Sequence, residues 1–176
     1  MSERSIELIK QSINGANKYD YFIVGIGAAT FSYFAKDFKV SEHFYFNEST
    51  VILLALILLS ISVICGLKTI SLYNIYLNKN GKYLDLSEHL AGYKKNVIEG
   101  GIAINEENGD ILYPDESELK VRALSKILPE RKNELHKLGN KIEVGYRIRD
   151  YSLFISYIFL AISKSMPLFI NLIPYN

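Results

Sequence analysis

The sequence predicts an all-α membrane protein with three transmembrane helices and a small, mostly helical cytosolic domain that contains a β-hairpin. The main observation is the stretch Val51–Leu67, which has no charge and no proline and holds twelve Ile, Leu or Val residues. As a helix it would cover about 26 Å, close to the hydrocarbon core of a bilayer. A second observation is that thirteen of the twenty Lys and Arg residues lie within residues 78–150, which indicates a soluble region between apolar segments.

The first predicted element is an amphipathic helix over residues 1–18. Its apolar residues Ile6, Ile9, Ile13 and Ala16 recur at helical spacing and share one face. Such a helix lies on the membrane surface or packs on the cytosolic part of the protein. A cleaved signal peptide is not expected, because the segment lacks a short apolar core followed by small cleavage-site residues.

A transmembrane hairpin is predicted over residues 19–77. Its first span, residues 19–35, is rich in Gly, Ala and Tyr, and its second span, residues 51–67, is strongly aliphatic. We expect the second helix to extend to about Leu77 and to end at Asn78–Gly81, because Asn and Gly are poor helix formers.

The cytosolic domain is predicted over residues 78–150, and the third transmembrane helix over residues 151–173. The expected elements within the domain are a helix over Leu84–Val97, a hairpin over Ile102–Tyr113, a helix from Asp115 or Ser117 to about Leu128, and another that begins at Pro129. The hairpin rests on a Glu-Glu-Asn-Gly turn between two β-type segments. Proline fits the first position of a helix, where its missing N–H is not needed.

The orientation follows from the distribution of basic residues. Cytoplasmic segments of membrane proteins carry an excess of Lys and Arg. The N-terminal segment has three, the first loop has two, residues 78–150 have thirteen and the segment after Ile173 has none. We therefore expect the N-terminus and the middle domain in the cytoplasm and the C-terminus outside.

Lys164 lies near the centre of the third predicted span. A lysine in hydrocarbon costs about 2.5–3.5 kcal/mol unless it snorkels to the interface, pairs, or faces water. Pro167 follows three residues later and frees a backbone carbonyl on the preceding turn. One interpretation is a snorkelling lysine in a tilted helix, and the other is a cation that lines a pore or binds a partner.

Small residues form one face of the first predicted span: Gly25, Gly27, Ala28 and Ala29. Gly25 and Ala29 are four residues apart, the spacing that lets membrane helices approach closely. The pattern predicts helix packing within one subunit or, alternatively, self-association.

Arg131 and His136 have the Arg-x4-His spacing of HEPN ribonucleases, in which Arg and His residues from two subunits act on RNA phosphates. Five residues along a helix place the two side chains about 140° apart, so they would share a site only across an interface. HEPN proteins prefer a polar residue such as Asn after the Arg, whereas this chain has Lys132. A solvated helix face is the simpler interpretation.

Other chemistry has little support in the sequence, and we expect neither an enzyme, a cofactor nor a metal site. Cys65 is the single cysteine, His43 and His89 lack partners at metal-ligand spacing, and there is no phosphate-binding glycine loop. A basic cytosolic surface for anionic lipid, a nucleotide or RNA is the weaker alternative to an ordinary solvated surface. Its candidate residues are Lys94, Lys95, Lys120, Arg122, Lys126, Arg131, Lys132 and Lys137.

The order of elements resembles small bacterial membrane effectors of anti-phage systems, in particular the Pycsar-type and SLATT-type effectors. The segment NKYDYFIVGIGAATFSYFAK is similar to the first span of uncharacterised bacterial proteins of this size. The Arg131 and His136 pair resembles the divergent HEPN motif of membrane-pore accessory proteins in RNA-targeting CRISPR systems. The resemblance is one of architecture and implies an oligomer that opens or disrupts the inner membrane on a cytosolic signal.

The function expected from the sequence is a non-enzymatic, homo-oligomeric membrane effector or pore that responds to a cytosolic protein or nucleotide. The alternative is a structural or accessory subunit of a membrane complex without its own pore. A third reading, RNA cleavage through Arg131 and His136, depends on a single degenerate motif.

Overall fold

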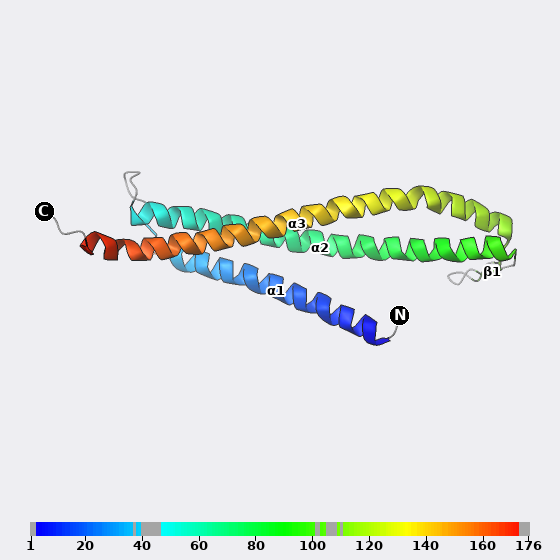
Figure 1. The fold of residues 1–176 in the computed structure, drawn as a ribbon, viewed down its shortest axis with the longest axis horizontal. Helices are drawn as coiled ribbons and strands as arrows, with labels where there is room; N and C mark the ends of the chain where they lie inside the picture. The colour runs from blue at the N-terminus through cyan, green and yellow to red at the C-terminus, as the bar shows by residue number, and fades with distance from the viewer. Residues whose placement is uncertain are drawn as a thin grey trace. The chain divides into compact units, whose positions relative to one another are not determined.

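The computed structural model describes residues 3–36, 38–39, 47–100, 103–104, 109 and 111–172, and within them the chain forms three long helices (Figure 1). Helix α1 spans Glu3–Lys36, α2 spans Glu48–Glu99 and α3 spans Pro114–Leu172. The amphipathic segment and the first predicted span thus belong to one continuous helix, α1.

Helix α2 runs through the predicted break at Asn78–Gly81 without interruption. One glycine costs a helix about 1 kcal/mol, which the packing of a long helix readily outweighs. At its start, the Asn47 side chain accepts a hydrogen bond of 2.9 Å from the backbone N–H of Thr50. At its end, Gly100 has a φ of 63°, the left-handed conformation that glycine adopts after a helix, and its N–H donates to the carbonyl of Asn96.

Helix α3 continues through Pro129, where the sequence predicts the start of a new helix. A proline inside a helix removes one backbone hydrogen bond, but the buried Leu128 and Leu135 on either side hold this part of α3 in place by packing. The helix begins at Pro114, where Glu116 accepts a hydrogen bond of 3.3 Å from the backbone N–H of Tyr113. Proline is suited to the first helical position, because the backbone N–H that it lacks would make no hydrogen bond within the helix there.

The fold class is helical, and the prediction of a β-hairpin over Ile102–Tyr113 is wrong at that length, because the described residues there form only a two-residue pairing. Strands β1 (Ala103–Ile104) and β2 (Ile111–Leu112) have two residues each and pair antiparallel, with Ala103 opposite Leu112. Pairing this short adds little stability without further strands or a packed face. Most of the predicted turn lies outside the described residues.

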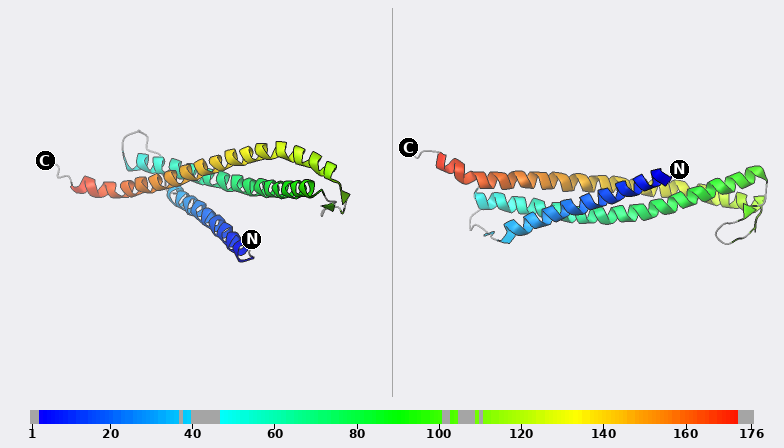
Figure 2. Two further views of the ribbon diagram at one scale, coloured as in Figure 1. Left: turned by 45° about the vertical axis from the view of Figure 1, so that its right-hand side comes forward. Right: turned by 90° about the horizontal axis from the view of Figure 1, so that it is seen from below.

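The chain divides into two compact units, and the boundaries between them fall inside α2 and α3. Unit 1 consists of residues 1–71 and 142–176, and unit 2 consists of residues 72–141. In unit 1, the C-terminal part of α1 lies beside the beginning of α2 and the C-terminal part of α3 (Figure 2). Its apolar core is formed by Ala55, Leu59 and Leu160, with Phe31, Phe34, Leu153 and Phe159 packed around them.

Unit 2 is a pair of antiparallel helical segments from α2 and α3. The Asn96 amide donates a hydrogen bond of 2.7 Å to the hydroxyl of Ser117, and both side chains are buried. The exposed side chains of Lys79 and Glu134 form an ion pair of 3.4 Å. The buried hydrogen bond between Asn96 and Ser117 fixes the alignment of the two segments. Either side chain would lower the stability of the fold if it were buried without a partner.

The prediction of three membrane spans is wrong by length and composition: among the described residues only α2 is long and apolar enough to cross a membrane. The segment over residues 19–35 is weakened by Asp20 and by its glycines and tyrosines, and the described part of residues 151–173 contains Lys164 and several serines. Ile173 lies outside the described residues. In the most apolar window of α2, 33% of the residues are buried.

Candidate functional site

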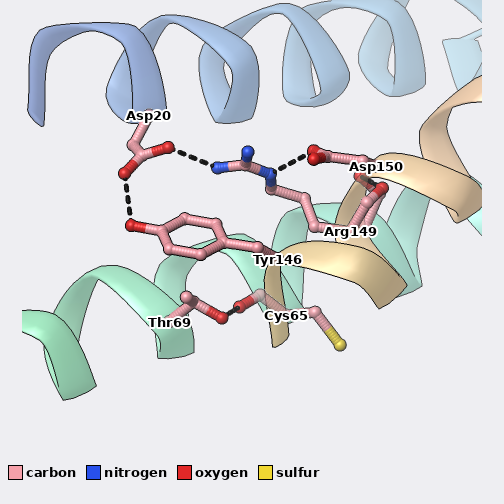
Figure 3. Close-up of polar contacts among 7 residues, drawn as sticks. Asp20, Cys65, Thr69, Tyr146, Arg149 and Asp150 are labelled. Atoms are coloured by element: carbon pink, nitrogen blue, oxygen red, sulfur yellow. Dashed lines mark hydrogen bonds and ion pairs between the residues drawn. The ribbon is translucent and has the colours of Figure 1, made fainter. Parts of the chain in front are cut away.

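Arg149 on α3 and Asp20 on α1 form the most deeply buried ion pair described in unit 1. The Arg149 Nη1 group donates to Asp20 Oδ1 across 2.7 Å, and the side chains are 3% and 10% exposed. Figure 3 shows the guanidinium pointing from α3 toward the carboxylate on α1. An isolated charge in such a place would lose several kcal/mol of hydration, so each group depends on the other.

Further polar groups complete the cluster around this pair. The Tyr146 hydroxyl donates to the second Asp20 oxygen across 2.6 Å, and its ring lies beneath the guanidinium, with Arg149 Cζ 4.8 Å from the ring centroid. Arg149 Nε donates to Asp150 Oδ1 across 2.8 Å, and Asp150 itself is largely exposed (Figure 3). The Ser62 hydroxyl on α2 donates to the Arg149 carbonyl, so all three helices contribute to the cluster.

Glycines at two positions allow the helices to approach closely here. A Cβ atom at Gly66 would collide with Val24 and lie 3.1 Å from Cδ of Arg149. A Cβ atom at Gly145 would collide with the side chain of Thr69. Helices in membranes associate through small residues in this way, because close backbone approach increases packing contacts.

The charged and polar groups of the cluster are hydrogen-bonded to one another, and these bonds hold the helices together. The two Asp20 oxygens accept hydrogen bonds from Arg149 Nη1 and from the Tyr146 hydroxyl, and Arg149 Nε donates to Asp150. Among the described residues, no buried side-chain nitrogen or oxygen lacks a partner, and no group of three or more His, Cys, Asp or Glu is placed to hold a metal ion. The cluster therefore ties α1 to α3 and α2.

Unit 1 buries several polar side chains beside its apolar core and exposes many large apolar side chains. Its buried residues include Asp20, Ser62, Thr69, Arg149, Ser152, Ser156 and Ser163. The exposed face of α2 carries Leu54, Ile57, Ile61, Ile64 and Leu67, which are 39–64% exposed, and α3 exposes Phe154, Ile155, Ile158 and Ile162. The buried hydroxyls of Thr69, Ser156 and Ser163 donate to backbone carbonyls of their own helices. Soluble proteins rarely expose apolar faces of this extent.

Lys164, a predicted site residue, pairs with an acidic residue that the sequence did not suggest. Its Nζ lies 3.5 Å from Glu48 in the first turn of α2 and 5.9 Å from the ring centroid of Phe34. Both charged side chains are substantially exposed, so the pair is weak in water. Pro167 lies within α3, three residues further along the helix.

The small residues of α1 divide between two faces. Gly27 is buried, and a Cβ atom there would lie 3.2 Å from Val63 and 3.6 Å from Leu153. Gly25 and Ala29 are exposed, and a Cβ atom at Gly25 would meet nothing within 4 Å; Ala28 is half-buried. Packing within this chain thus uses Gly27, whereas the Gly25 and Ala29 pair faces outward.

Arg131 and His136 lie on an exposed part of α3 in unit 2. Arg131 Nη1 lies 3.4 Å from Glu134, and the His136 side chain is exposed. Within the described part of this chain, the structure brings no second Arg or His to this pair. His43, the third histidine considered from the sequence, lies outside the described residues.

Asp20, Tyr146 and Arg149 were not identified as a site from the sequence. One signal was present, because a carboxylate within a segment predicted to span a membrane is unusual and demands a partner. Comparison of the chain with protein family models, with characterised proteins and with solved structures found no match.

Proposed function

We propose that this chain is a non-enzymatic membrane effector: unit 1 inserts into the bilayer through α2, several copies assemble, and together they perturb the membrane in response to a signal that reaches unit 2. The observation that carries the proposal is that unit 1 buries polar side chains beside its small apolar core and exposes large aliphatic side chains. Its interior holds an ion pair and five other described polar side chains, while large Ile and Leu residues face outward.

This arrangement is favourable in lipid and unfavourable in water. Each Å² of apolar surface left in water costs about 25 cal/mol, so a face of five Ile and Leu residues on α2 favours transfer to hydrocarbon. The buried hydroxyl groups are satisfied by backbone carbonyls, which is how serines are accommodated inside membrane helix bundles. Lipid is therefore the proposed covering of this face.

We place unit 2 on the cytoplasmic side of the membrane. It follows the apolar part of α2 and contains eleven Lys and Arg residues among residues 72–141. Positive residues near the ends of a membrane segment are retained in the cytoplasm. Lys39, which lies between α1 and α2, is then on the opposite side.

Several copies are proposed because the described part of a single copy is closely packed inside and leaves no path for water. Gly27, Gly66 and Gly145 sit where a single added carbon would press on a neighbouring helix. Such an interior does not offer a water path, so perturbation of the membrane requires an interface between copies, for which closed symmetric assemblies are the usual solution. Membrane damage as the output is taken from the resemblance to anti-phage effectors, of which the described residues retain one candidate membrane helix and a helical unit 2.

Membrane insertion is tested by comparing two isoleucines on the same helix. Ile64→Arg places a charge on the apolar face of unit 1 and should release the protein from alkaline-washed membranes, since arginine costs about 2.5–3.5 kcal/mol at the centre of a membrane helix. Ile98→Arg, at an exposed position in unit 2, should leave the protein in the membrane fraction. Equal distribution of both variants would contradict insertion through α2.

The effector function is tested with the purified chain and dye-loaded vesicles. Release of the dye, at a rate that rises more steeply than linearly with protein concentration, supports an oligomeric effector. Stable insertion without release would contradict it and would instead favour an accessory subunit of a membrane complex.

A further inference from the structure

Unit 2 contains a cavity of about 520 Å³ between its α2 and α3 segments. Small-molecule sites occupy about 300–1,000 Å³, so the space is sufficient for a compact ligand. On α2 it is lined by residues that share one helix face, among them Lys82, Asp85, His89 and Tyr93. On α3 its wall includes Lys120 and the small residue Ala123.

Aromatic and cationic groups lie side by side in this cavity. The rings of His89 and Tyr93 are 6.3 Å apart between centroids and inclined by 21°, so their faces are nearly parallel. The ammonium of Lys120 lies 5.1 Å from the centroid of the Tyr93 ring. A flat aromatic ring that carries an anion matches both features, because the ring can take the place of the Lys120 ammonium over the face of Tyr93 while the lysines attract the anion.

We propose that this cavity binds a mononucleotide. In this assignment the base packs against the Tyr93 and His89 rings, above the apolar side chains of Leu86 and Leu124, and the phosphate is held by Lys82 and Lys120. Asp85 is the one carboxylate in the lining, and it is suited to accept a hydrogen bond from a base N–H.

Free inorganic phosphate and longer nucleic acid fit this lining less well. Phosphate alone would leave the aromatic rings and the two leucines unused. A polynucleotide needs a continuous basic track, whereas Asp85 lies between the lysine and the aromatic residues of α2. The additional idea that the nucleotide is the signal for the membrane effector rests on the proposed function, but binding does not depend on it.

Binding is measured by titration calorimetry on the detergent-solubilised full chain, with AMP, GMP, adenosine and inorganic phosphate as separate ligands. We expect AMP or GMP to bind at least about tenfold more tightly than adenosine or phosphate, since each of these lacks one half of the recognition. Equal affinity for phosphate alone, or no binding of either mononucleotide, would overturn the assignment.

Variants locate the site. Tyr93→Leu keeps an apolar side chain of similar size but removes the stacking face, and it should weaken mononucleotide binding about tenfold or more. Lys120→Gln removes the positive charge and should weaken mononucleotide binding about tenfold without changing the affinity for adenosine. Lys94→Gln, which alters an exposed lysine of the same helix outside the cavity lining, is the matched control and should bind as wild type does. Equal losses in Lys94→Gln and Lys120→Gln would overturn the assignment, because general charge would then explain the binding.

Fluorescence gives a second measurement of binding, in a variant that keeps an aromatic ring at position 93 and should therefore fold as the wild type does. The chain has no tryptophan, so Tyr93→Trp introduces a single tryptophan, which can be excited selectively and which preserves the aromatic face. Its fluorescence should be quenched by AMP or GMP and not by phosphate. Unchanged fluorescence at ligand concentrations that saturate the wild type would contradict stacking at this position. Because these measurements need no membrane leakage, a failure here leaves the effector proposal standing, and a failure of the vesicle assay leaves this site standing.

Discussion

Arg149 and Asp20, which are 129 residues apart in the sequence, form a buried ion pair of 2.7 Å that connects α3 to α1. The pair lies where Gly66 of α2 allows close approach, since a Cβ there would press on Arg149 itself. The three helices of unit 1 therefore meet at the Arg149 residue.

Breaking the buried pair should be strongly destabilising. Asp20→Asn removes the buried counter-charge of Arg149 and leaves only the exposed Asp150 carboxylate beside it, and we expect a loss of about 3–5 kcal/mol in the free energy of unfolding. The matched control is Arg147→Met, which removes an exposed pair of 2.6 Å with Glu143 and should change stability by less than about 1 kcal/mol. Denaturation followed by circular dichroism measures both.

The double variant Asp20→Asn with Arg149→Met removes both charges and should recover part of the stability lost in Asp20→Asn, because no buried charge remains. Additive losses in this double-mutant cycle would show that the two side chains contribute independently, contrary to the geometry.

Glycine substitutions should separate packed from open positions. Gly145→Ala should destabilise unit 1 by about 1–3 kcal/mol, because the new methyl group collides with Thr69. Gly25→Ala should be neutral or stabilising by up to about 1 kcal/mol, since nothing lies within 4 Å and alanine favours the helix. Thr69→Ala should restore much of the stability of Gly145→Ala; a failure to do so would contradict the close approach of α2 and α3.

The proposed sidedness predicts opposite labelling of two introduced cysteines. In a Cys65→Ser background, Ile98→Cys in unit 2 should react with an impermeant thiol reagent only after the cells are opened. Lys39→Cys, which precedes the apolar part of α2 and is exposed, should react in intact cells. Labelling of Ile98→Cys from outside would reverse the orientation.

Lys164 is predicted to affect membrane perturbation more than stability. Its pair with Glu48 is exposed, so Lys164→Leu should change the free energy of unfolding by less than about 1 kcal/mol. If its ammonium faces water in the assembled protein, the same variant lowers dye release from vesicles at matched insertion. Glu48→Gln is the control: an equal reduction would assign the effect to the ion pair and not to a lining role of the lysine.

Local sequence patterns were sufficient to predict the helices and the position of the apolar segment. The aliphatic run over Val51–Leu67 lies inside α2, and the expected helix over Leu84–Val97 is a part of the same helix. The predicted ends at Asn78–Gly81 and at Pro129 are wrong, because local preferences of about 1–3 kcal/mol per residue decide a helix end only where packing does not oppose them.

By itself, the sequence determined which segments are apolar, where basic residues gather, and that the long segments are helical, since each of these depends on neighbours a few residues apart. Only the tertiary structure decided that Asp20 faces Arg149, that Lys164 meets Glu48, and that Gly27 packs while Gly25 faces outward. These pairings depend on the rotation and register of each helix against the others. A shift of one residue rotates a side chain by about 100° around its helix, so contacts between distant segments follow from the packing of the whole unit.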